Sequence, residues 1–162
     1  MNDFDRQARN VARLAECHAI FANRVRLLIN ALEVEGWRPR IQDAWRSPVM
    51  QLQLLKEGTT RRSWGFHNAT RADGTPDSLA VDLLDDDSPK DSRMSYCIAL
   101  ARQARLWQLD TGILWGLDER HIRAVEDAIQ GGPLPAERGW DPTHVEPDDI
   151  SENEARSGKR PK

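Results

Sequence analysis

Residues 78–84 read Ser-Leu-Ala-Val-Asp-Leu-Leu, a short apolar run with an acidic residue in its middle, and they give the clearest indication of the fold. A run of this length and composition is typical of a buried strand. Side chains alternate along a strand, so residues 79, 81 and 83 share one face and Asp82 lies on the other. A buried carboxylate is costly unless it is paired or binds a metal. The alternative is that Asp82 lies on the solvent face of an edge strand, but Ala80 and Leu84 make that face poorly suited to water.

Helical periodicity and turn residues on either side of this strand predict a mixed α+β fold. Ser47-Pro48 is typical of a helix start, and Asp118 is a capping residue for a later helix. Residues 58–77 hold several glycines and prolines among polar residues and are expected to form a loop. The expected helices cover 5–35, 47–57, 91–109 and 119–129, and the other strands cover 37–45, 111–115 and a segment around Val145.

Length and composition predict one soluble domain. The chain has 162 residues, of which 39% are hydrophobic and 30% charged, and its net charge is -3. A mildly acidic chain argues against nucleic acid as the main partner. No apolar run reaches the ~20 residues needed to cross a bilayer, and the first residues lack the features of a secretory signal. We expect a monomer with a folded domain over residues 1–146 and a polar, disordered tail over 147–162.

Two histidines lie near turn residues rather than on the apolar faces of helices. His67 follows Trp64-Gly65-Phe66, and His144 enters the last expected strand. Together with Asp82 they offer the donor set of a catalytic zinc site, in which two imidazoles and a carboxylate leave one position for water. Such a site also needs a carboxylate that accepts a proton. Asp141, three residues before His144, and Glu146, two residues after it, are the candidates.

Five blocks of sequence, in this order, resemble the metallopeptidase family of D-alanyl-D-alanine carboxypeptidases and L-alanyl-D-glutamate endopeptidases. The resemblance is closest to its bacteriophage endolysin branch and spans roughly residues 35–146. It implies a small antiparallel sheet with flanking helices, the Hedgehog/DD-peptidase-like zinc peptidase fold. The loop between His67 and Asp82 is longer than in the common family pattern. The blocks are Ala44-Trp45-Arg46-Ser47, Gln51 with Gly58, Phe66-His67, residues 78–82 and Asp141-Pro142-Thr143-His144.

The resemblance implies a role for each of these side chains. His67, Asp82 and His144 would bind one Zn²⁺ per chain. Asp141 would be the catalytic base, with Glu146 as the alternative because the family more often has Glu at the base position. The family resemblance further implies that Arg46 holds a substrate carbonyl or carboxylate and offsets oxyanion charge, and that Gln51 contacts substrate. The alternative for Arg46 is a structural ion pair.

The tryptophans allow two interpretations. Trp64 and Trp140 flank the proposed ligands and belong either to the wall of a substrate cleft or to core packing. For Trp37, Trp107 and Trp115 we expect core packing.

The resemblance implies a zinc peptidase that cuts the bond between L-alanine and D-glutamate in bacterial peptidoglycan. As an endolysin, it would be made in the host cytoplasm and reach the cell wall after release at lysis. A D-Ala-D-Ala carboxypeptidase or dipeptidase is an alternative within the enzymes. A non-catalytic cell-wall or virion binding module on the same fold is an alternative of another class.

Overall fold

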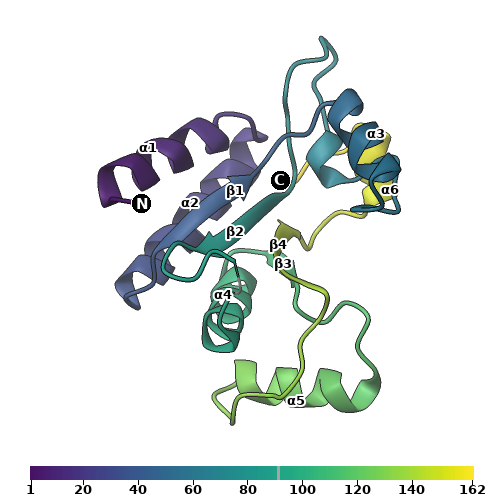
Figure 1. The fold of residues 1–162 in the computed structure, drawn as a ribbon. Coiled ribbons are helices and arrows are strands. Elements are labelled where there is room, and N and C mark those ends of the chain that lie inside the picture. Colours follow the sequence, from purple (N-terminus) through teal and green to yellow (C-terminus); the bar gives the residue numbers. More distant parts are fainter. Residues whose placement is uncertain (91) are drawn as a thin grey trace.

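Four antiparallel strands form a single small sheet in the computed structural model, which describes residues 1–90 and 92–162 (Figure 1). Their order across the sheet differs from their order in sequence, because β4 lies between β2 and β3. This arrangement confirms the expected α+β class with a small antiparallel sheet. In spatial order the strands are β1 (Pro39–Asp43), β2 (Val81–Asp85), β4 (Asp141–Pro147) and β3 (Leu109–Gly112).

Strand β2 has the two-faced character that its alternation predicts. Leu79, Val81 and Leu83 are fully buried, whereas Asp82 is only partly covered. Helix α4 (Met94–Leu106) packs near this apolar face, and the Tyr96 hydroxyl on α4 donates a hydrogen bond to the Leu83 carbonyl at 3.0 Å. The core therefore lies on one face of the sheet, which leaves the Asp82 face available for a site.

The remaining helices surround this sheet (Figure 1). Helix α1 (Asp3–Leu14) packs on β1, and α5 (Glu119–Ile129) packs on α4. Helix α2 (Ala19–Val34) packs on α4 and β1, while α3 (Pro48–Lys56) begins at the expected Ser47 cap. Within the described residues, none of these helices has the length and apolar character needed to span a membrane.

The expectation of one long helix over residues 5–35 is wrong. The helix breaks between α1 and α2, where residue 17 forms an isolated parallel bridge with Ser78. The backbone N–H of Ser78 donates to the Glu16 carbonyl, and the N–H of His18 donates to the Ser78 carbonyl, both at 2.9 Å. Pairing with a distant segment thus replaces helical hydrogen bonds at the Glu16 carbonyl and the His18 N–H.

The structure also corrects the expectation of a disordered tail over residues 147–162. Residues 152–156 form helix α6 (Glu152–Arg156), whose start is closed by reciprocal hydrogen bonds between Ser151 and Glu154. The side chain of Arg160 then pairs with Asp77 at 2.6 Å. The segment is polar in composition, yet its charges find partners on the folded domain.

Several element ends differ from the expected ones by a few residues. The strand expected at 78–84 begins only at residue 81, and the strand expected at 37–45 covers 39–43. The helix expected at 91–109 covers 94–106, and residue 91 lies outside the described part of the chain. The strand expected at 111–115 covers 109–112.

Candidate metal centre

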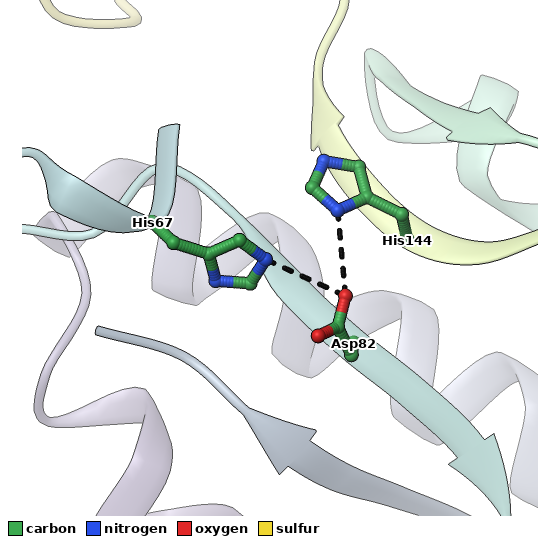
Figure 2. Close-up of side chains that lie close together, drawn as sticks. All are labelled: His67, Asp82 and His144. Atoms are coloured by element: carbon green, nitrogen blue, oxygen red, sulfur yellow. Dashed lines mark hydrogen bonds and ion pairs between the residues drawn. The ribbon is translucent and has the colours of Figure 1, made fainter. Parts of the chain in front are cut away.

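Pairing between β2 and β4 places Asp82 directly opposite His144. Paired residues in neighbouring strands project to the same face, so the two side chains meet. His67 arrives from the short 3-10 turn η1 (Phe66–Asn68) in the loop before β2. Asp82 Oδ1 lies 3.4 Å from His67 Nε2 and 3.3 Å from His144 Nδ1, and Figure 2 shows both rings directed at this oxygen. One ligand atom from each residue lies within 4.8 Å of the others.

The hydrogen bonding of His67 leaves one ring nitrogen available as a ligand. Nδ1 lies 2.5 Å from the Ala44 carbonyl. A carbonyl only accepts, so Nδ1 carries the proton and Nε2 keeps its lone pair. Nε2 is buried and has no hydrogen-bond partner within the described residues. A buried polar atom without a partner is costly, and a metal ion at this point would satisfy it.

His144 is held on both sides of its ring by carboxylates. Its Nε2 donates to Glu146 Oε2 at 3.0 Å, while Nδ1 faces Asp82. The Trp115 ring packs against the imidazole with centroids 5.0 Å apart. Burial alone would lower the pKa of His144, but hydrogen bonds to Asp82 and Glu146 outweigh it and raise that pKa to about 9. A cation that binds Nδ1 therefore has to displace a proton at neutral pH.

The second oxygen of Asp82 is occupied by an arginine. Arg46 Nη2 donates to Asp82 Oδ2 at 2.7 Å, and Arg46 Nε contacts Asp43. Burial would raise the pKa of Asp82, but the imidazoles of His144 and His67 outweigh it and hold that pKa well below its usual range. Asp82 is thus a fixed anion that presents Oδ1 to the two imidazoles.

A cavity of about 510 Å³ opens over this cluster. Asp141 lines it, and burial together with the charge of Asp82 raises the pKa of the Asp141 carboxyl. The backbone of Asp141 lies so close to Gly112 on β3 that a Cβ at Gly112 would collide with the Asp141 carbonyl. The absence of a side chain at Gly112 therefore allows β4 to place Asp141 at the edge of the cavity.

The other residues singled out from the sequence differ in whether they line the cavity. Gln51 and Trp140 line the cavity, and the Gln51 side chain is anchored by a hydrogen bond from Nε2 to the Arg62 carbonyl at 2.7 Å. Glu146 also lines the cavity but contacts His144. Trp64 is not among the lining residues, and the Arg156 guanidinium lies over its ring at 6.0 Å.

Trp115 is the lining residue that the sequence interpretation placed in the core. It packs between His144 and Trp140, whose ring centroid lies 5.2 Å away. The neighbouring Gly116 has φ +79°, and a Cβ there would approach the Trp140 ring to 3.0 Å. The sequence feature that could have indicated this position is Gly116, which follows Trp115 at the end of the expected strand.

Comparisons with known proteins find likenesses of fold among solved structures. No family model matches the chain, and no curated protein matches its sequence. The solved structure of the L-Ala D-Glu endopeptidase ChiX from Serratia marcescens is similar over 86% of each chain, at 18% identity and a TM-score of 0.46. A mutant of the vancomycin resistance D,D-pentapeptidase VanY, from the VanB-type resistance cassette and in complex with Zn(II), is similar over 87% of this chain and 76% of its own, at 13% identity and a TM-score of 0.48. At these identities the likeness concerns the fold alone.

Proposed function

We propose that this protein is a zinc-dependent peptidase that cuts amide bonds in peptidoglycan stem peptides. The observation that carries the proposal is the convergence of His67 Nε2, Asp82 Oδ1 and His144 Nδ1 on one point beneath an open cavity. Two imidazoles and one carboxylate suit Zn²⁺ and leave a coordination position for water or substrate. In the part of the chain that the structure describes, this group contains no fourth His, Cys, Asp or Glu, unlike most structural zinc sites.

The bound ion would supply Lewis acidity to a substrate carbonyl and lower the pKa of water. The chain supplies the remaining functions. Asp141 lines the same cavity, and its raised pKa suits a carboxylate that accepts a proton and returns it to a leaving amine. Glu146 and the Ala44 carbonyl fix the two imidazole rings through the nitrogens that face away from the ligand point.

Arg46 makes a structural ion pair, in addition to the catalytic contact that the resemblance implies. Its ion pair with Asp82 Oδ2 leaves Oδ1 for the ion, which is a positioning role. That Arg46 also contacts a substrate carbonyl stays a prediction.

The cavity wall suits a peptide. Gln51 is almost fully buried, and its Oε1 has no hydrogen-bond partner within the described residues, so it can accept from an amide N–H. Trp115 and Trp140 add an aromatic surface on which a side chain or sugar edge can pack. The specific bond, between L-alanine and D-glutamate, follows from the sequence resemblance and is part of the proposal.

The test is digestion of purified peptidoglycan by the zinc-loaded protein, with products identified by mass spectrometry. Cleavage at the proposed bond exposes a new amino group on D-glutamate, whereas a carboxypeptidase releases terminal D-alanine. Wall binding without any released fragment would favour a non-catalytic module. His67→Ala should abolish release of fragments, and His121→Ala, at a partly exposed position of α5, serves as the control.

The biological setting is a further part of the proposal. An endolysin made in the host cytoplasm would lyse bacteria that express it only when the inner membrane is permeabilised. Lysis that does not depend on permeabilisation, or no lysis under either condition, would count against that setting.

A further inference from the structure

The cavity extends away from the metal centre to helix α1, where Arg9 and Arg13 line it. Arg9 is held by the backbone of β1: its Nε donates to the Ile41 carbonyl at 2.8 Å and its Nη2 donates to the Gln42 carbonyl at 2.7 Å. These two hydrogen bonds fix the guanidinium group. They leave its positive charge without a carboxylate in contact, as far as the described residues go.

This sets Arg9 apart from the other arginines of the cavity. Each of the others contacts a carboxylate: Arg13 pairs with Glu16, Arg46 with Asp43 and Asp82, and Arg62 with Glu152. Their charges are therefore largely compensated within the protein. Among the described residues that line the cavity, Arg9 is the arginine without a carboxylate partner, and its charge is available to an anion from outside.

The electrostatic surroundings of Arg9 agree with this. Burial lowers the pKa of Arg9, and the nearby Arg40 and Arg13 guanidinium groups lower it further. Asp43 and Glu16 offset only part of this effect. The cation thus lies in a region where positive charge is in excess, and an added anion would be stabilised there.

Arg9 and the metal centre belong to one continuous wall. Gln42, whose carbonyl holds Arg9, precedes Asp43, and Asp43 pairs in register with Asp82 on the neighbouring strand. Adjacent strands lie about 4.8 Å apart. An extended peptide lying in the cavity can therefore reach both places.

We propose that Arg9 forms an anion subsite that binds a carboxylate of the peptide whose amide bond is cut at the metal centre. The inference rests on the proposed function and narrows its substrate to acidic peptides. A guanidinium group with free N–H donors can bind a carboxylate through two parallel hydrogen bonds. Substrates with this carboxylate converted to an amide would lose that interaction.

The experiment compares two stem peptides, one with free carboxylates and one with the same groups amidated. We expect wild type to show a kcat/KM for the acidic peptide about tenfold above that for the amidated one. Arg9→Gln should bring this ratio close to one by lowering the rate on the acidic peptide. Arg9→Lys, which keeps the charge but loses the planar fork, should give an intermediate ratio. The control is Arg26→Gln, on an exposed position of α2, which should leave the ratio unchanged.

Binding is measured in parallel, by fluorescence anisotropy of the labelled peptides, and zinc content and thermal stability are measured for each variant. Cleavage with the same acidic preference in Arg9→Gln would overturn the subsite and leave the proposed function intact. A second outcome is that wild type binds the acidic peptide more tightly than the amidated one, that Arg9→Gln removes this preference, and that wild type cleaves neither peptide. This outcome would overturn the proposed function and leave the subsite intact. Equal affinity of wild type for both peptides would overturn the subsite.

Discussion

Asp141 and Glu146 line the same cavity, yet their contacts predict opposite consequences of removing their charge. Glu146 accepts a hydrogen bond from His144 Nε2 at 3.0 Å, whereas Asp141 contributes a carboxyl whose pKa is raised by burial and by Asp82. We expect Asp141→Asn to lower kcat and leave zinc affinity within about tenfold. We expect Glu146→Gln to weaken zinc binding and leave activity at saturating zinc within about tenfold.

The magnitudes follow from the two roles. General base catalysis contributes about 10²–10⁴ in rate, so Asp141→Asn should raise the activation free energy by about 3–5 kcal/mol. A carboxylate that orients a metal-binding histidine is worth about 10–100-fold in metal affinity, which is about 1.4–2.8 kcal/mol for Glu146. Each loss therefore appears in one assay and is nearly absent from the other.

The assays are a competitive zinc titration with a chromophoric chelator and a peptide cleavage assay with zinc in excess. Glu146 also helps to raise the pKa of His144 to about 9, so its removal eases loss of the His144 proton. The titration is therefore run above pH 9, where orientation of the ring is the main difference left. Loss of activity in Glu146→Gln at saturating zinc, with Asp141→Asn active, would refute this assignment and make Glu146 the base.

Four further results are expected. The apparent zinc affinity should rise about tenfold per pH unit between pH 7 and 9, because the ion must displace the His144 proton, and a flat profile in a buffered titration would contradict the raised pKa. In the zinc-free protein the same raised pKa stabilises the fold below the unfolded value of about 6.5, and urea titrations should show that contribution lost as the pH rises through 9. Cys17, whose pKa is raised to about 12 by burial and by Glu16 and Asp77, should resist iodoacetamide at pH 8 in the native protein, and modification located there by mass spectrometry would show that the site opens. Gly112→Ala should lower the free energy of unfolding by about 1–3 kcal/mol in urea because the added methyl group meets the Asp141 carbonyl, and unchanged stability would show that β3 and β4 separate easily.

Local pattern was sufficient to predict the strand that carries the site. Alternation alone separates Asp82 from the fully buried Leu79 and Leu83, because the side-chain period of a strand is a property of the backbone. The partners of Asp82 are different, since His67 and His144 lie far from it in sequence. Spacing alone did not distinguish this pair of histidines and Asp82 from other combinations of histidine and acidic residues. The resemblance of the surrounding blocks selected them.

The parts that sequence did not predict depend on contacts between distant segments. Apolar spacing continues through His18, so nothing in the periodicity marks the break between α1 and α2, which the bridge to Ser78 produces. The end of the chain shows a different limit. Its polar composition indicated disorder, although Ser151 and Glu154 have the spacing of a helix-capping pair, and it is held in place by ion pairs such as Arg160 with Asp77.

Zinc content after removal of each ligand tests the centre most directly. We expect wild type to retain one Zn²⁺ per chain after dialysis, and His67→Ala, Asp82→Ala and His144→Ala each to lose it, with affinities reduced by at least the ~100-fold seen for outer-shell partners. His121→Ala, which removes a partly exposed histidine from α5, should retain the ion. Retention of zinc by all three ligand variants, or no zinc binding by wild type, would contradict the proposed metal centre.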